Sequence, residues 1–248
     1  MHKKIAMMAL AGAACLPLAV TAQQEEADDS YVYATYMVCD TTRQEEADKI
    51  FEDVHQPILD AAVSDGAIDG YGWLAHHTGG NWRRIRYHRA GSIDALLAGL
   101  DTIGEKISDA SGDDKSYGEI CNMHDDYIWH SVAGNGGDSR GKVSMSAYHV
   151  CDMAREGRAD EIVKSVFAKH YDANLGAGKL ASWGWSEHIV GGEYRRLSTM
   201  TAADWPTLFK MRAAIFEAIA EEDNPLADEF SEICSSHSDY MWEIVQEK

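Results

Sequence analysis

The second half of this 248-residue chain repeats the first half in register. The segment Tyr36–Asp40 returns 112 positions later as Tyr148–Asp152, with one difference in five residues. Further matches follow at this offset, or at 113 after one inserted residue: Arg43/Arg155, Asp60/Asp172, Gly72–Trp73/Gly184–Trp185, His76/His188, Arg83–Arg84/Arg195–Arg196, Glu119–Cys121/Glu232–Cys234 and His124–Trp129/His237–Trp242. Such self-similarity indicates a duplicated structural unit. The sequence therefore predicts two copies of one fold, at residues 31–132 and 143–246, joined by a glycine-rich linker at 133–142.

Each copy is expected to run β-α-β-β-α-β, which makes the chain an α+β protein. Residues 31–39 are rich in aromatic and β-branched side chains, as strands are. Apolar residues then recur at helical spacing, and residues 71–77 and 82–88 predict two strands around a turn. Ser92 and Asp204 are good N-caps for a second helix, and a last strand is expected at 120–132 in the first copy.

This element order is the ferredoxin-like plan, and two such units packed sheet to sheet resemble the dimeric α/β-barrel superfamily, with both halves fused in one chain. The superfamily includes antibiotic-monooxygenase-like, polyketide-cyclase-like and muconolactone-isomerase-like proteins. The resemblance covers residues 31–246 and rests on the order and length of the elements. It implies a fold and a monomer that acts as a pseudo-dimer, and it implies no particular chemistry.

Residues 1–22 have the features of a cleavable signal peptide. Lys3 and Lys4 supply the positive start, residues 5–20 are apolar, and the small residue Ala22 precedes the expected cleavage site. We therefore expect a periplasmic or secreted protein.

The chain without residues 1–22 would carry 20 Lys and Arg against 41 Asp and Glu, a formal charge of −21. A surface with a large net negative charge repels nucleic acid and anionic lipid. No later segment is apolar enough to predict a membrane span. We expect a small-molecule ligand as the partner, with neither nucleic acid nor membrane.

Four cysteines remain after residue 22, an even number in a compartment that permits disulfides. The resemblance implies the strand order 4-1-3-2, which places the end of strand one beside the start of strand four. Cys39 and Cys121 would then pair, as would Cys151 and Cys234. Neither pair has Cys-x-x-Cys spacing, so a metal or redox role is the weaker alternative.

If Cys39 faces Cys121 across the ladder, antiparallel pairing also places Tyr36 opposite His124, with Asp126 two residues along on the same sheet face. The second copy repeats the arrangement. The candidate catalytic residues are therefore Tyr36, His124, Asp126, Tyr148, His237 and Asp239. A histidine between an aspartate and a tyrosine can act as a general acid or base. The same side chains can instead satisfy one another's hydrogen bonds as a structural cluster in the space between the two sheets.

Four further residues are candidates for substrate binding: His76, His188, Arg84 and Arg196. The alternatives are structural histidines and ion pairs within this acidic protein.

No zinc motif, phosphate loop or nucleotide fingerprint is present, so we expect no cofactor or metal, although the fold would allow haem. The function stays open between two classes. One is an exported small-molecule-binding protein that could act as an enzyme, doing proton-transfer or oxygenation chemistry on a small, partly apolar organic substrate without a nucleotide cofactor. The other is a non-catalytic, disulfide-stabilised, acidic periplasmic or extracellular module with a structural or interaction role.

Overall fold

Eight antiparallel strands close into one barrel, in the order β1-β3-β2-β8-β5-β7-β6-β4. The structure is a computed structural model that describes residues 30–137 and 139–248, so the predicted signal peptide lies outside the described residues. In chain order the elements are β1 (Tyr31–Val38), α1 (Gln44–Ile50), η1 (Phe51–His55), α2 (Gln56–Ser64), β2 (Gly70–Thr78), β3 (Arg84–Ala90), α3 (Ile93–Ser111), α4 (Ser116–Ile120), β4 (Met123–Gly136), β5 (Val143–Val150), α5 (Glu156–Ile162), η2 (Val163–Phe167), α6 (Ala168–Asp172), β6 (Leu180–Val190), β7 (Arg196–Ala202), α7 (Trp205–Glu222), α8 (Pro225–Ile233) and β8 (Ser236–Glu247).

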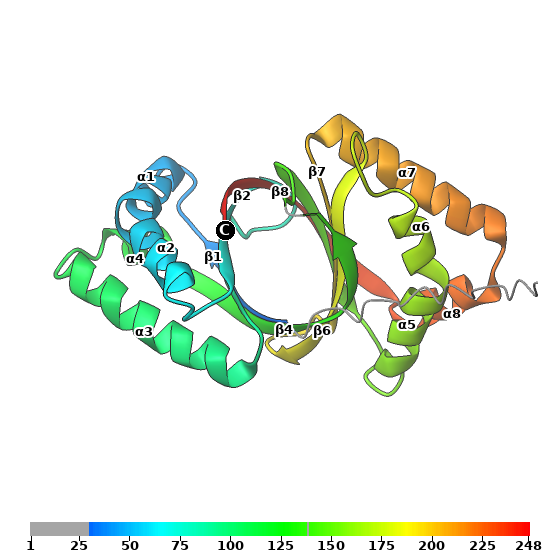
Figure 1. The fold of residues 1–248 in the computed structure, drawn as a ribbon, viewed down its shortest axis with the longest axis horizontal. Coiled ribbons are helices and arrows are strands. Elements are labelled where there is room, and N and C mark those ends of the chain that lie inside the picture. The colour runs from blue at the N-terminus through cyan, green and yellow to red at the C-terminus, as the bar shows by residue number, and fades with distance from the viewer. Residues whose placement is uncertain (1–29, 138) are drawn as a thin grey trace, which may run out of the picture.

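The two halves of the chain join edge to edge. Each contributes four neighbouring strands, and the halves meet where β2 pairs with β8 and β4 pairs with β6. The two sheets are therefore parts of one wall around a common interior, and closure leaves no free sheet edge. Helices of the first half cover one outer side of the barrel, and helices of the second half cover the opposite side (Figure 1). No helix in the described ranges is both long and apolar enough to cross a bilayer.

Local sequence signals set several element boundaries. The hydroxyl of Ser92 accepts a hydrogen bond from the Ala95 amide at 3.2 Å, and the Asp204 carboxylate accepts one from the Thr207 amide at 2.8 Å, so both residues cap their helices as predicted. The last strand of the first half differs from its prediction. β4 continues to Gly136, well into the segment that was predicted as linker.

Both predicted disulfides are present. Cys39 bonds to Cys121 and Cys151 bonds to Cys234, each with its Cα atoms 3.9 Å apart. Each bond closes a loop of more than 80 residues between the first and last strands of its half. Disulfides of this kind persist in oxidising compartments.

The register deduced from the disulfides is wrong by one residue. His124 lies opposite Met37 instead of Tyr36, and His237 lies opposite His149 instead of Tyr148. Cys121 stands just after the short helix α4, where its amide donates to Tyr117 O at 2.9 Å. It therefore lies outside the ladder and does not set the pairing of β1 with β4. A one-residue slip moves every following side chain of the strand to the other face of the sheet.

Aromatic side chains pack at the centre of the barrel. Trp82 stacks on Tyr36 and on Tyr240, with ring centroids 4.4 and 4.9 Å apart. The predicted register, which placed His124 and Asp126 in the space between the sheets, would put Tyr127 and Trp129 on the opposite sheet face; both belong instead to this inner cluster. The cluster draws residues from both halves, so it ties the halves together as one core.

Candidate functional site

The predicted catalytic cluster is divided between the two faces of the barrel wall. Tyr36 and Tyr148 point into the barrel, where their rings meet edge to face at 5.4 Å and both are fully buried. Burial raises the pKa of each phenol above its ordinary value, so both stay protonated. His124 and Asp126 lie on the outer face, in the ladder rows of Met37 and Thr35. Tyr36 and His124 therefore share no site.

Both predicted contacts between a histidine and an aspartate are present, and both lie on the outer face of the barrel wall. His124 Nδ1 lies 2.9 Å from Asp126 Oδ2, and His237 Nε2 lies 3.5 Å from Asp239 Oδ2. The surroundings of the two pairs differ. His124 and Asp126 line a cavity, whereas His237 lies beside His149, with ring centroids 5.5 Å apart.

This cavity, which we call the chamber, lies between the outer face of the first-half sheet and the helices α3 and α4, and it measures about 650 Å³. The sheet side supplies Tyr33, Thr35, Met37, Arg86, His124 and Asp126, and the helix side supplies Leu97, Leu100, Asp101 and Tyr117. Its wall is thus mostly polar on the sheet and, apart from Asp101, largely apolar on the helices. Pockets of this size and mixed lining commonly hold small organic ligands.

Arg86 is the cation of the chamber. Within the described residues, no carboxylate lies within 4.0 Å of its guanidinium, and its Nε is buried without a hydrogen-bond partner. On the same row of the sheet, Asp126 lies beyond Thr35, and its Oδ1 is also buried without a partner. Buried polar groups normally find partners, so these two mark a place where a ligand or water completes the structure.

Two buried histidines lie near Arg86. His55 on η1 and His88 on β3 are each no more than 2% exposed. Burial lowers the pKa of His55 to about 4 and that of His88 to about 3, and the positive charge of Arg86 lowers both further. The two imidazoles are therefore neutral near pH 7. Nδ1 of His55 and both ring nitrogens of His88 lack a hydrogen-bond partner.

Sequence reasoning missed Arg86, His55 and His88 because it looked for residues that both copies share. At the repeat offset these positions carry Ser198, Phe167 and Met200. The divergence between otherwise similar copies was the signal available in the sequence. At these three positions the first half carries an arginine and two histidines, whereas the second half carries a serine, a phenylalanine and a methionine.

The predicted substrate-binding arginines lie outside the chamber. Arg84 donates to Asp48 at 2.6 Å from both Nε and Nη2. Arg196 donates in the same way to Asp160 at 2.7 Å. Both side chains are buried, and their charges are compensated. They hold the first helix of each half against the sheet.

The predicted histidines His76 and His188 also have local partners. Arg83 Nη1 lies 3.0 Å from the His76 ring nitrogens, and Arg195 Nη1 lies 2.8 Å from His188 Nδ1. Burial and then the adjacent arginine lower the pKa of both imidazoles. Both residues stand near the turn glycines at one end of the barrel, away from the chamber.

No family model matches the chain, and no curated protein matches it. Solved structures do match. A candidate monooxygenase from Fusobacterium nucleatum aligns over 90% of this chain and 94% of its own, with a TM-score of 0.58 at 8% identity. An anthrone oxidase-like protein aligns over 90% and 94%, with a TM-score of 0.52 at 11% identity. A mutant chlorite dismutase from Candidatus Nitrospira defluvii aligns over 88% and 92%, with a TM-score of 0.51 at 7% identity.

The expectation of no cofactor is corrected by these comparisons. Structures that match this chain include chlorite dismutases and a protein described as a heme-binding protein from Thermus thermophilus, the latter at 10% identity and a TM-score of 0.46. In this chain neither His55 nor His88 lines the chamber, and His124 stands at its exposed rim beside Asp126. Among the described residues, the chamber therefore presents no buried imidazole nitrogen that could bind a haem iron. The described residues also hold no cluster of three or more His, Cys, Asp or Glu that could bind a metal ion.

The matched structures share between 7% and 11% sequence identity with this chain. Similarity at this level supports a shared fold and carries no information on function. They nevertheless align over most of both chains. Together with the closed eight-stranded barrel and its two outer helix layers, they show that this chain has the fold of the dimeric α/β-barrel superfamily.

Proposed function

We propose that the chamber binds a small organic anion with an apolar part, and that His124 removes a proton from it. The observation that carries the proposal is Arg86, a half-buried guanidinium that faces the cavity without a carboxylate partner in the described chain. An uncompensated buried charge is unfavourable in the free protein. A bound carboxylate would offset that cost through short, charge-assisted hydrogen bonds.

The opposite wall selects the rest of the ligand. Leu97, Leu100 and Tyr117 line the chamber from the helices and offer apolar surface to a ring or an alkyl group. The chamber is large enough, at about 650 Å³, for a single-ring or two-ring compound. An aryl-substituted acid with an acidic C–H bond fits both walls.

The His124–Asp126 pair supplies the base. Asp126 Oδ2 lies 2.9 Å from Nδ1, so this nitrogen carries the proton and Nε2 is free to accept one from the ligand. Tyr33 shares the same wall, and burial together with the negative charge of Asp126 raises its pKa. It stays protonated and can donate a hydrogen bond to an enolate oxygen as charge develops.

The test uses benzoylacetate, an anion that joins a phenyl ring, a carboxylate and an acidic methylene group. Proton removal is followed in D₂O by the loss of the methylene signal in the proton NMR spectrum. The chain should accelerate this exchange above the buffer rate. His124→Ala should remove the acceleration while benzoylacetate still binds, and Arg86→Gln should weaken binding by about tenfold or more.

The second copy provides the matched control. His237 and Asp239 repeat the His/Asp pair, but Ser198 stands where the first copy has Arg86. His237→Ala should therefore leave exchange unchanged. Exchange that survives His124→Ala, or that never exceeds the buffer rate, contradicts the proposal and favours a non-catalytic binding module. Oxygen uptake that accompanies exchange would identify the reaction as an oxygenation of the carbanion.

We further propose that the chain is exported after cleavage behind Ala22 and that its halves arose by duplication of one ferredoxin-like unit. The features of residues 1–22, the two disulfides and the in-register repeat support this proposal. N-terminal sequencing of the protein recovered outside the cytoplasm should begin at Gln23. A start at any other residue contradicts the cleavage site.

A further inference from the structure

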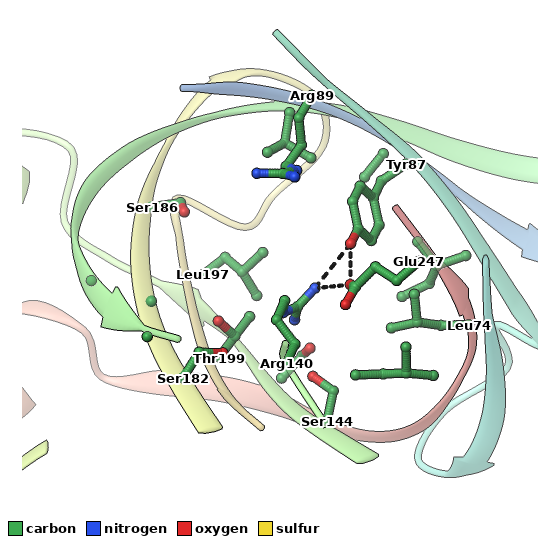
Figure 2. Close-up of a pocket in the computed structure, with 18 of the residues that line it drawn as sticks. Leu74, Tyr87, Arg89, Arg140, Ser144, Ser182, Ser186, Leu197, Thr199 and Glu247 are labelled. Carbon is green, nitrogen blue, oxygen red and sulfur yellow. Dashed lines mark hydrogen bonds and ion pairs between the residues drawn. The ribbon is translucent and has the colours of Figure 1, made fainter. Parts of the chain in front are cut away.

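The interior of the barrel contains a second cavity, the lumen, with a volume of about 810 Å³ (Figure 2). The barrel wall separates it from the chamber. Along β1, Val32, Ala34 and Tyr36 line the lumen, while the alternating residues Tyr33 and Thr35 line the chamber. Nothing in the proposed function uses the lumen.

The two halves of the chain line the lumen with different chemistry. From the first half come Val32, Ala34, Leu74 and Tyr87. At the repeat offset of 112 the second half supplies Ser144, Ser146, Ser186 and Thr199. Figure 2 shows Leu74 and Tyr87 across the lumen from Ser186 and Thr199. At these four pairs of equivalent positions the first half is apolar apart from the Tyr87 hydroxyl, whereas the second half carries hydroxyl groups.

Ser144 is an unsatisfied member of the hydroxyl wall. Its side chain is 1% exposed, and its Oγ lies buried without a hydrogen-bond partner. A hydroxyl in this state can both donate and accept. Leaving it unpaired is unfavourable, and a ligand oxygen in the lumen would satisfy it.

The charged side chains that line the lumen lie toward one end: Arg89, Arg140, Glu247 and Lys248. Arg140 and Glu247 neutralise each other, and Lys248 pairs with Asp60 at 3.0 Å. Arg140 Nη1 donates to Glu247 Oε1 at 2.6 Å and to the Tyr87 hydroxyl at 3.1 Å, and Tyr87 also donates to Glu247 (Figure 2). The other end is closed by the fully buried rings of Tyr36, Tyr148 and Trp129. No other described residue that lines the lumen carries a charge.

We propose that the lumen is a second ligand site, for an uncharged ring compound that carries hydroxyl or carbonyl groups along one edge. The apolar face of the compound lies on the first-half wall, and its oxygens bond to Ser144 and its neighbours on the second-half wall. The ion pair of Arg140 and Glu247 bounds the site at its charged end. The volume is within the range of pockets that bind small molecules.

Two probes that differ by one hydroxyl test the proposal. Calorimetric titration of the full chain should show tighter binding of 2-naphthol than of naphthalene. Ser144→Ala should weaken 2-naphthol binding by about 2- to 10-fold, the usual effect of one neutral hydrogen bond, and leave naphthalene binding within about twofold. Ala34→Leu fills the lumen from the apolar wall and should weaken the binding of both probes.

Matched variants locate the probe. Ser198 stands next to Thr199 on β7 but faces outward, where its Oγ lies 3.1 Å from His149 Nε2, so Ser198→Ala should change neither affinity. Arg86→Gln, in the chamber, should also leave 2-naphthol binding intact. The proposal is overturned if neither probe binds up to its solubility limit, or if 2-naphthol binding survives Ser144→Ala unchanged. Loss of 2-naphthol binding in Arg86→Gln would place the probe in the chamber and overturn the proposal equally.

Discussion

Arg84 and Asp48 form a two-pronged ion pair, in which Nε and Nη2 of the arginine each donate to one carboxylate oxygen at 2.6 Å. The indole of Trp73 donates to the same aspartate at 2.9 Å. The second half repeats the arrangement with Arg196, Asp160 and Trp185. The two halves differ in the number of carboxylates beside the arginine. Arg196 also contacts Glu156 at 3.2 Å, whereas Arg84 pairs with Asp48 alone among the described carboxylates.

This difference predicts unequal effects of the same substitution. Asp48→Asn should lower the free energy of unfolding by about 3 kcal/mol, because it leaves a buried arginine without a counter-charge. Asp160→Asn should cost about half as much, since Glu156 remains beside Arg196. Urea denaturation followed by circular dichroism measures both values. Equal losses, or a larger loss for Asp160→Asn, would show that Glu156 does not compensate.

Stability should fall in acid because of buried neutral histidines. The pKa of His88 is about 3 in the folded chain, against about 6.5 when unfolded. Between these values the unfolded chain binds a proton that the folded chain does not, so the free energy of unfolding decreases as the pH falls. One such histidine contributes a slope of about 1.4 kcal/mol per pH unit.

The variant His88→Phe isolates this contribution. It should flatten the pH dependence of stability between about pH 6 and pH 4 by the slope of one histidine. His55 and His149, both with a pKa of about 4, would keep their own contributions in this variant. Denaturation midpoints at several pH values in this range give the slope. Parallel curves for the wild type and the variant would mean that His88 is protonated in the folded state.

The two disulfides should stabilise the chain to a similar extent. They close loops of 82 and 83 residues, for which the chain-entropy relation gives about 4.5 kcal/mol each. We expect Cys39→Ala with Cys121→Ala, and Cys151→Ala with Cys234→Ala, to lower the free energy of unfolding by comparable amounts. Denaturant titration of the two double variants provides the comparison. A loss confined to one variant would show that only that disulfide stabilises the chain, and two separate transitions would show that the halves unfold independently.

A single chain should be sufficient for the barrel. Both contacts that close it, β2 with β8 and β4 with β6, are made within one chain. Sedimentation equilibrium should therefore give the mass of one chain over a wide range of concentration. A stable dimer at low micromolar concentration would contradict this expectation.

The sequence by itself determined the features that depend on local chemistry or on the repeat. The hydroxyl of Ser92 and the carboxylate of Asp204 cap helices wherever the helices pack, because the cap bonds join residues only three positions apart. The four cysteines stand at equivalent positions of the two halves, and with the strand order that the resemblance implies they predicted one disulfide within each half; both are present. The His124–Asp126 contact also follows from alternation along a single strand.

Only the tertiary structure decided which face of the wall each side chain occupies. The helix α4 ends at Ile120, directly before the bonded cysteine, and shifts the pairing of β1 with β4 by one residue. Because side chains alternate along a strand, this shift of one residue places Tyr127 inside the barrel and His124 on the chamber side of the wall. The chamber and the lumen join side chains from segments far apart in the sequence. Their burial, and the unpaired state of Arg86 and Ser144, depend on how those segments pack, which no local pattern records.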